Sequence, residues 1–414
     1  MRGGERFFMT KSYLDKNVYD AALERIHFIF DEFDDVCVTF SGGKDSSDLL
    51  HLTLQVARMR NRLPLKVMFI DLEAQYRMTI DHVEEMLNRD EITPYWICLP
   101  LNLRNAVSVF EPHWCCWDLE RREDWVRPMP ENRGVISDTG FFPFFWHRME
   151  FEEFAREFAH WLAGDGKIAI LVGIRADESH HRYRTIVGYR KSRHKNRGWT
   201  TWLSPQVCNA YPIYDWRVED VWAYIGKHRL PYNKLYDHMY LSGMTLHKMR
   251  ICQPYGDDQR KSLDMFHRIE PNTWSKVVNR VAGANYGSLY SGQKMLGYRR
   301  GIGLPDGHTW QSYTKLLLET LPESSRLQYQ EKFATFINWW RTQGGWQGDI
   351  PDVSDPKMEA AKKAPSWRRM AMCILKNDFW CRSLSFAQTK KTYGNHLPTL
   401  DRRKRHDATS TKRP

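Results

Sequence analysis

The 414-residue chain is predicted to fold as an α/β protein with a doubly wound parallel sheet, followed by a mostly helical C-terminal domain. Three observations lead to this prediction. Short apolar, β-prone runs alternate with helical patterns through the first half of the chain, which is typical of parallel strands joined by helices. A glycine turn follows the first apolar run directly. Beyond about residue 262, helical patterns continue without obvious strands.

The individual elements follow from the spacing of apolar residues. Helical spacing predicts helices over residues 17–33, 45–60, 78–87 and 147–163. Continuous apolar runs predict strands over residues 36–40, 65–70, 95–99 and 168–172. Further helices are expected over residues 274–282, 310–321 and 327–340. Because ligands bind at the carboxyl ends of the strands in such sheets, the residues after 40, 70 and 172 are expected at one binding edge.

Six residues after the first predicted strand form the most informative motif, Ser41-Gly42-Gly43-Lys44-Asp45-Ser46. A glycine turn between strand and helix directs backbone N–H groups and the positive helix end towards an anion. The two glycines let phosphate oxygens approach the backbone, the lysine adds a charge, and the serines add hydroxyl donors. An ordinary surface turn with helix capping is the alternative. The motif predicts a site that binds a nucleotide by its phosphates.

A second group of charged residues follows the fourth predicted strand. It begins with Gly173-Ile174-Arg175-Ala176-Asp177-Glu178-Ser179 and continues through Arg182. From Ser179 to Arg197 the chain has seven Lys or Arg residues and no acid. Because Arg can bind phosphate or sulfate through two nitrogens, this stretch suits an anionic ligand, with a solvated basic loop as the alternative. Asp71, which ends the second strand, is expected at the same edge.

Composition and charge limit the class of protein. Hydrophobic residues make up 42% of the chain and aromatic residues 14%, which indicates a packed globular protein. No apolar run approaches membrane-spanning length and the N-terminal residues have no apolar signal core, so a cytoplasmic protein without a membrane partner is expected. Of the net charge of +11, residues 390–414 carry +6, from eight Lys or Arg against two Asp. This segment is predicted to be a flexible basic tail, either a solubilising end or a contact for nucleic acid.

Three motifs in one order carry a resemblance to a known family. SGGKDS is followed by GIRADES, and then by the run PIYDW, DVWAYI and LPYNKLYD within residues 212–237. This order resembles the phosphoadenosine phosphosulfate (PAPS) reductase family of the PP-loop superfamily, also called adenine nucleotide alpha hydrolase-like. The resemblance covers roughly residues 20–260. It is strongest to the subgroup with an extra C-terminal domain of unknown function, which includes the immunoglobulin-binding regulator A type proteins.

The resemblance implies roles for particular residues. The six PP-loop residues, Ser41 to Ser46, would hold the phosphate or sulfate end of an adenine nucleotide, which is PAPS, adenosine 5′-phosphosulfate (APS) or ATP. The full expected nucleotide-binding set also includes Asp71, Gly173, Arg175, Glu178 and Arg182. Lys44, Asp45 and Arg175 are the expected catalytic residues, and Asp45 could hold Mg²⁺ if the ligand is ATP. The domains expected are a nucleotide-binding domain at 1–261, a helical domain at 262–389 and the tail at 390–414.

The chain also departs from the family. Reductases of the family use a cysteine in a C-terminal Glu-Cys-Gly-Leu-His segment, and this chain has no such segment. The iron–sulfur branch uses a tandem Cys-Cys and a later Cys-x-x-Cys. Cys115 and Cys116 match the first pair, but Cys252 is followed three residues later by Tyr255 in place of the second cysteine. A cluster on Cys115, Cys116 and Cys252 is therefore a minor alternative to plain buried thiols.

The leading hypothesis is a PAPS reductase-like enzyme of sulfur metabolism or an ATP pyrophosphatase-like transferase. It would either transfer or reduce a sulfonate with an external thiol donor, or transfer an adenylyl group from ATP. A regulatory protein that senses a nucleotide without turnover is a second hypothesis, favoured by the missing cysteine and the extra domain. A nucleic-acid modification protein is a third, based on the basic segments. A protein partner is compatible with each of these hypotheses.

Overall fold

The structure is a computed structural model that describes residues 14–108, 110–188, 191–251, 255–256, 263–284 and 303–385. The chain forms two compact units, each built from more than one segment. The first unit contains residues up to 103, 115–254 and 269–276, and the second contains 104–114, 255–268 and the residues from 277 onwards. The domain boundary expected at residue 261 stays a prediction. The expected tail at 390–414 lies outside the described residues.

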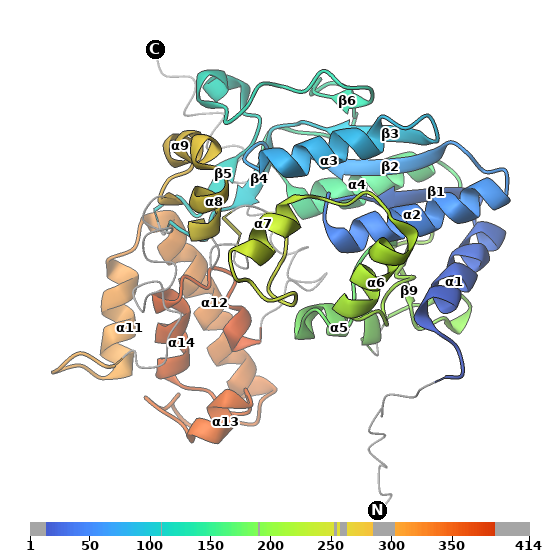
Figure 1. Cartoon of the computed structure of the whole chain (residues 1–414). Coiled ribbons are helices and arrows are strands. Elements are labelled where there is room, and N and C mark those ends of the chain that lie inside the picture. Colours follow the sequence, from blue (N-terminus) through green and yellow to red (C-terminus); the bar gives the residue numbers. More distant parts are fainter. Residues whose placement is uncertain are drawn as a thin grey trace, which may run out of the picture. The chain divides into compact units, whose positions relative to one another are not determined.

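A seven-stranded sheet forms the centre of the first unit, with the strand order β6-β3-β2-β1-β8-β10-β9 (Figure 1). The strands are β1 (Asp35–Thr39), β2 (Leu65–Ile70), β3 (Ile92–Ile97), β6 (Val135–Ile136), β8 (Ile168–Val172), β9 (Thr200–Trp202) and β10 (Val207–Ala210). Neighbouring strands pair in parallel, except that β9 runs antiparallel to β10. The predicted mostly parallel sheet is therefore confirmed.

Helices cover both faces of this sheet, as expected for a doubly wound fold. In Figure 1, α2 and α3 lie in front of the sheet and α4 lies behind it. The helices of this unit are α1 (Val18–Glu32), α2 (Lys44–Met59), α3 (Arg77–Leu87), α4 (Phe151–Ala163), α5 (His180–Val187), α6 (Val218–His228) and α7 (Leu235–Leu241). In α1, the buried residues Ala22, Ile26, Ile29 and Phe30 form one apolar face, which is why this segment becomes an amphipathic helix.

Strand β3 begins at Ile92, three residues before the start predicted from the sequence. Pro94 hides this start, because proline gives no backbone N–H to a sheet and is usually found at its edges. Here β6 pairs only with Trp96 and Ile97, so Pro94 lies on a part of β3 that has a strand neighbour on one side only. The proline is tolerated because the sheet ends beside it.

The stretch between β3 and α4, predicted as irregular, contains a second, three-stranded sheet with the order β5-β4-β7. Its strands are β4 (Leu101–Arg104), β5 (His113–Cys115) and β7 (Met149–Glu150), and the 3₁₀ helix η1 covers Leu119–Asp124. A further 3₁₀ helix, η2 (His194–Asn196), lies before β9. Because Met149 and Glu150 belong to β7, α4 begins at Phe151 and not at His147 as predicted.

The second unit is mostly helical, as predicted. Its described residues beyond 302 form α11 (Trp310–Glu319), α12 (Glu323–Thr342), α13 (Pro356–Ala360), α14 (Trp367–Leu375) and the 3₁₀ helix η5 (Arg382–Leu384). Two more helices, α8 (Leu263–Ile269) and α9 (Pro271–Arg280), have residues in both units. An aromatic core that includes Tyr329, Phe333 and Phe336 holds α12 and α14 together. Cys373 and Cys381 lie in this core as buried side chains.

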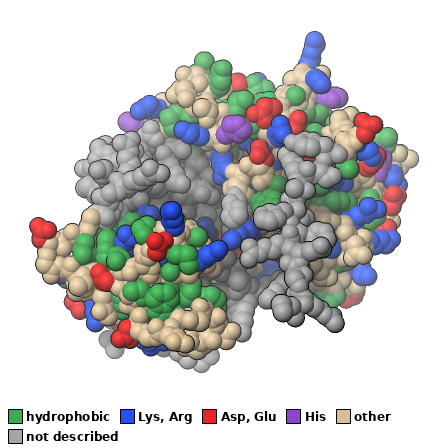
Figure 2. All heavy atoms as spheres, turned by 90° about the horizontal axis from the view of Figure 1, so that it is seen from below, with side chains coloured by type: hydrophobic (Ala, Val, Ile, Leu, Met, Phe, Trp, Pro, Cys, Tyr) green, Lys and Arg blue, Asp and Glu red, His purple; other side chains and the backbone are tan. Residues whose placement is uncertain are grey.

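The described helices are all too short or too polar to cross a membrane. Figure 2 shows one face of the molecule, on which Lys and Arg side chains lie among Asp and Glu side chains. Hydrophobic side chains also reach this surface. On the coloured part of this face, basic and acidic side chains are therefore interspersed.

Candidate nucleotide-binding site

The six PP-loop residues connect β1 to α2 at the carboxyl edge of the sheet. Gly42 has a φ of +71°, and a Cβ at this position would lie 2.9 Å from Cγ2 of Thr79, so both conformation and space require glycine. Helix α2 begins at Lys44, and its N-cap residue, Gly43, has no side chain that could cap this end. The start of α2 therefore has the character of an anion-binding helix terminus.

The two serines of the loop hold its shape. The hydroxyl oxygens of Ser41 and Ser46 lie 3.0 Å apart, and the Ser46 hydroxyl accepts a hydrogen bond from the Ser41 N–H at 3.2 Å. The Ser46 hydroxyl also donates to the carbonyl of Gly43 at 2.9 Å. These contacts close the loop on itself, so that its backbone is shaped before any ligand binds.

Lys44 lies at the base of the site with only 3% of its surface exposed. Its ammonium group donates to the Met249 carbonyl and to the Asp45 carboxylate, each at 3.3 Å, and lies 5.3 Å from the centre of the Tyr236 ring. The backbone N–H of Lys44 donates to the Tyr236 hydroxyl at 3.1 Å. Both ammonium contacts are long for charged hydrogen bonds, so a phosphate oxygen would be a stronger partner.

Asp45 is bound by Arg175, which comes from the loop after β8. Nε of Arg175 donates to Oδ1 of Asp45 at 2.6 Å, and both side chains are largely buried. A guanidinium N–H of Arg175 also donates to the Trp216 carbonyl at 3.5 Å. Asp45 therefore contacts both of the other predicted catalytic residues, and Arg175 neutralises the carboxylate beside Lys44.

A pocket with an empty volume of about 310 Å³ opens above the PP-loop. It is lined by Ser41, Gly43, Lys44, Asp45, Ser46, Gly173, Glu178, Arg182, Tyr236, Arg250 and Ile251. Glu178 pairs with Arg182 at 2.8 Å and with Arg250 at 3.6 Å, and Arg250 also donates to the Glu178 carbonyl. Eight of the residues predicted from the sequence thus line one pocket together, while Gly42, Arg175 and Asp71 are not among its lining.

Gly173 brings the end of β8 against the PP-loop. A Cβ at Gly173 would lie 3.0 Å from the Asp45 carbonyl oxygen and 3.0 Å from Cα of Ser46. The two main chains are therefore in direct contact, which explains why a glycine follows the strand at this position.

Three lining residues were not predicted as site residues: Tyr236, Arg250 and Ile251. Tyr236 belongs to the run LPYNKLYD, whose buried Asn233 donates to the Gly42 carbonyl at 2.9 Å and to the Thr79 hydroxyl at 3.0 Å. This run therefore supports the PP-loop from a position about 190 residues away in the chain. The motif was the available signal for Tyr236, whereas nothing in the sequence around Arg250 points to the pocket.

Asp71 lies at the end of β2 and is fully buried. Its Oδ1 accepts from the Glu73 N–H at 2.9 Å and from Arg127, and its Oδ2 accepts from the Trp96 indole N–H at 2.8 Å. Both carboxylate oxygens are thus bound by protein groups. The structure places Asp71 in a network of the protein interior, so a direct contact with the nucleotide stays a prediction without support here.

Asp48 is the most unusual charged group of α2. It is 0% exposed, and neither of its carboxylate oxygens has a hydrogen-bond partner among the described residues. Burial raises the pKa of this carboxyl well above its usual value, and the nearby charge of Asp45 raises it further. The neutral, protonated form is therefore favoured one helical turn behind the PP-loop.

The described cysteines offer no exposed thiol. Cys37, Cys98, Cys115, Cys116, Cys208, Cys373 and Cys381 are all buried. Of the predicted cluster residues, Cys252 lies outside the described residues, and Cys116 donates to the Leu99 carbonyl at 3.5 Å. Burial raises the pKa of the Cys116 thiol well above its usual value. Cys115 has a different environment, beside Asp118 and His147.

Comparison with known proteins gives two family matches. The phosphoadenosine phosphosulfate reductase domain matches residues 35–243, and a domain of unknown function, DUF3440, matches residues 243–350 and 346–394. The chain is 40% identical over 385 residues to an uncharacterized protein, YbdN, of Escherichia coli (strain K12), which covers 91% of this chain and 92% of that protein.

Two further similarities are shorter or more distant. An adenosine 5′-phosphosulfate reductase of Staphylococcus haemolyticus is 38% identical over 77 residues, or 19% of this chain and 27% of that protein. The solved structure of a PAPS reductase from Candida auris in a phosphate complex is 15% identical, covers 57% of this chain and 96% of that one, and has a TM-score of 0.31.

Proposed function

The chain belongs to the phosphoadenosine phosphosulfate reductase domain family, and we propose that it is an enzyme that binds an adenine nucleotide by its phosphate or sulfate end in the PP-loop pocket. The observation that carries this proposal is the pocket itself. It joins the start of α2, the buried Lys44 and two arginines, Arg182 and Arg250, around one opening. Each of these groups attracts an anion.

The charged side chains of the pocket form ion pairs with one another, and a bound anion could replace the acidic partners. Glu178 holds Arg182 and Arg250, and Asp45 holds Arg175, so the arginines are paired while no ligand is present. The phosphosulfate or triphosphate end of such a nucleotide carries more negative charge than one carboxylate and offers more oxygens. Its entry would therefore give Lys44 and the arginines better partners than the long contacts that Lys44 makes to Met249 and Asp45.

For the reaction, we propose adenylyl transfer from ATP. Among the described lining residues there is no cysteine, and adenylyl transfer needs no thiol from the protein. An acceptor would form a bond to the α-phosphorus, and the bond from that phosphorus to the bridging oxygen would break. Pyrophosphate would leave with the electron pair, and Lys44 with the start of α2 would stabilise its charge.

The metal groups expected from the sequence do not fit these side chains. The Asp45 carboxylate is bound by Arg175 at 2.6 Å and by Lys44 at 3.3 Å, which leaves it poorly suited to hold Mg²⁺. Cys116 donates to the Leu99 carbonyl, and Cys252, the third residue of the predicted cluster, lies outside the described residues. No step of the proposed reaction is therefore assigned to Mg²⁺ or to an iron–sulfur cluster.

A second candidate reaction is the transfer of a sulfonate from PAPS or APS to an external thiol. The family match over residues 35–243 favours it. A thiolate from the co-substrate would form a bond to the sulfonate sulfur, and the bond from that sulfur to the nucleotide phosphate oxygen would break. The same pocket would hold the departing nucleotide phosphate.

A turnover assay tests both reactions. Full-length protein, purified without oxygen, is incubated with ATP, APS or PAPS in the presence of dithiothreitol, and the nucleotide products are separated by chromatography. AMP transfer with release of pyrophosphate supports the first reaction, and loss of the sulfonate supports the second. Lys44→Ala should abolish either activity, while Lys227→Ala, an exposed lysine of α6, should leave it unchanged. Tight binding of a nucleotide without any turnover would contradict the enzyme proposal and support a sensor.

A further inference from the structure

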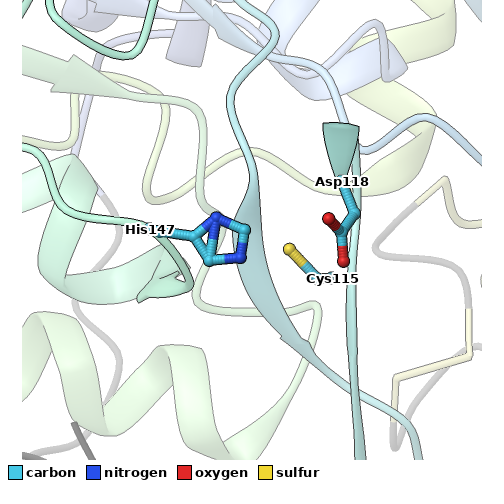
Figure 3. Close-up of side chains that lie close together, drawn as sticks. All are labelled: Cys115, Asp118 and His147. Atoms are coloured by element: carbon cyan, nitrogen blue, oxygen red, sulfur yellow. The ribbon is translucent and has the colours of Figure 1, made fainter. Parts of the chain in front are cut away.

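Three side chains that can hold a metal ion meet at one place in the first unit. Sγ of Cys115, a carboxylate oxygen of Asp118 and a ring nitrogen of His147 all lie within 4.8 Å of one another. Cys115 and Asp118 are buried, whereas His147 is exposed. Figure 3 shows that the sulfur, the carboxylate and the imidazole are directed towards a common space.

The surrounding structure fixes where these donors lie. Cys115 ends β5 and His147 comes two residues before β7, and both strands flank β4 in the small sheet. Within this sheet, Leu101 of β4 is in register with Met149 of β7, and its carbonyl accepts from the Cys116 N–H at 3.1 Å. Two chain positions 32 residues apart are thereby brought to the same strand.

Asp118 is held from both sides. It is the N-cap of η1, where its carboxylate accepts from the Glu120 N–H at 3.2 Å, and its carbonyl accepts from the Trp125 indole N–H at 2.9 Å. The residue before it, Trp117, donates its backbone N–H to the buried Glu73 carboxylate at 2.7 Å. The carboxylate is therefore positioned by backbone contacts that do not need a metal.

We propose that Cys115, Asp118 and His147 bind one Zn²⁺ ion and leave a fourth position open for water or a ligand. Thiolate, imidazole and carboxylate are the three ligand types that Zn²⁺ uses in proteins, and three protein ligands with an open position are typical of zinc sites that are not purely structural. Softer and harder cations are less well matched to this mixed set. The proposal goes beyond the nucleotide site and does not depend on the proposed reaction.

The geometry needs only a small adjustment. Zinc bonds of about 2.0–2.3 Å in a tetrahedron place the donor atoms roughly 3.3–3.8 Å apart. The present limit of 4.8 Å is about one ångström wider. His147 is exposed and lies in a loop before β7, so rotation of its side chain can bring the ring nitrogen closer to the other two donors.

Bound zinc would also join the two ends of a stretch with little regular secondary structure. Between Cys115 and His147 the structure contains one 3₁₀ helix and the two-residue strand β6. An ion held by residues from both ends closes this segment into a loop. Zinc should therefore make local unfolding of the segment less favourable and raise the stability of the full chain.

The test uses the full-length protein stripped with a chelator and then titrated with Zn²⁺ and with Co²⁺. We expect one Zn²⁺ per chain by calorimetry, a rise of the melting temperature, and a near-ultraviolet absorption band from Co²⁺ bound to a thiolate. Cys115→Ser should remove the Co²⁺ band, and His147→Ala should weaken Zn²⁺ binding by about 100-fold or more. Cys116→Ser is the matched control, because this neighbouring thiol contacts the Leu99 carbonyl, and it should keep the band.

Two results would overturn the proposal. One is the absence of stoichiometric zinc binding in a folded wild-type chain, as judged by circular dichroism. The other is equal loss of the Co²⁺ band in Cys115→Ser and Cys116→Ser, which would assign the metal to a cysteine pair. If Cys115→Ser fails to fold, Asp118→Asn serves instead: it should retain the thiolate band while lowering the affinity for Zn²⁺.

Discussion

The ends of β1 and β2 lie side by side in the same sheet, yet they have opposite characters. The end of β1 leads into a glycine loop, a helix start and a pocket lined by charged side chains. The end of β2 leads into Asp71, which is fully buried and has both carboxylate oxygens bound by Arg127, Trp96 and Glu73. The end of β1 thus borders a pocket that could admit an anion, whereas the end of β2 is occupied by protein side chains.

This difference shows that a place at the carboxyl edge of a parallel sheet is not enough to define a site. What separates the two ends is whether the local charges already have short, buried partners. At Asp71 they do, so the charge serves stability. At Lys44 the two ammonium contacts are both 3.3 Å long, so a phosphate oxygen could form a shorter and stronger hydrogen bond with this group.

The largest expected effect is on stability, from Asp71→Ala. This change leaves Arg127 without its partner in a buried place, which should lower the free energy of unfolding by about 3–5 kcal/mol. Urea unfolding measures it. Asp124→Ala, which removes an exposed partner of Arg121, should change stability by less than about 0.5 kcal/mol. If Asp71→Ala changes the free energy of unfolding as little as Asp124→Ala does, the Asp71 network does not stabilise the fold, and the proposed difference between the ends of β1 and β2 is wrong.

The next effect is on binding, from Lys44→Ala. Loss of a charged hydrogen bond to phosphate is worth about 1.5–3 kcal/mol, so the dissociation constant for the nucleotide should rise roughly 10- to 150-fold. Calorimetric titration measures this, with Lys227→Ala as the exposed control. Because Asp45 keeps Arg175, the unfolding free energy should change little. If Lys44→Ala strongly lowers the free energy of unfolding, the Lys44 charge serves stability, as the Asp71 charge does.

A smaller effect is expected from Asn233→Ala. The change removes three buried hydrogen bonds, which the side chain donates to the Gly42 carbonyl and the Thr79 hydroxyl and accepts from the Leu235 N–H, and should cost about 2–3 kcal/mol of stability. Because the PP-loop loses its support, nucleotide affinity should fall as well. Comparison of unfolding and binding for this variant with Asn209→Ala, on β10, separates the support of the loop from a general loss of stability.

Asp48 gives the finest test, through pH. Burial raises its pKa in the folded chain, so below its ordinary value of 3.8 both states are protonated and the full stability is present. As pH rises above that value, the unfolded chain releases the proton first, and the free energy of unfolding should fall by up to about 1.4 kcal/mol per pH unit until the folded pKa is reached. Asp48→Asn should remove this slope in unfolding measured from pH 4 upwards. An unchanged slope would mean that Asp48 is ionised in the folded chain.

The sequence predicts the parts of this fold that depend on local pattern. Apolar runs indicated β1, β2 and β8, and SGGKDS indicated the loop between β1 and α2, because glycine conformation and helix initiation are local properties. Strand β3 was predicted over residues 95–99 but covers Ile92–Ile97, because Pro94 masks its start and the apolar run continues beyond its end. Strands β6 and β7, of two residues each, are too short to give a period.

The missing parts of the site depend on contacts between distant segments. Arg250 reaches the pocket through Glu178, and His147 reaches Cys115 through the pairing of β7 with β4. The burial of Asp71 likewise depends on Arg127, which follows an irregular stretch. No spacing rule connects these residues, so only the folded chain brings them together.

The contact between Gly173 and the PP-loop has a consequence for selectivity. A Cβ at Gly173 would lie 3.0 Å from main-chain atoms of Asp45 and Ser46, and main-chain atoms, unlike side chains, have no other rotamers to adopt. In the proposed site, the space for the anionic group would therefore be set by a fixed backbone distance. Arg182 and Arg250, in contrast, line the pocket with side chains that can change rotamer. Discrimination by size and discrimination by charge would then belong to separate parts of the protein, and evolution could alter one without disturbing the other.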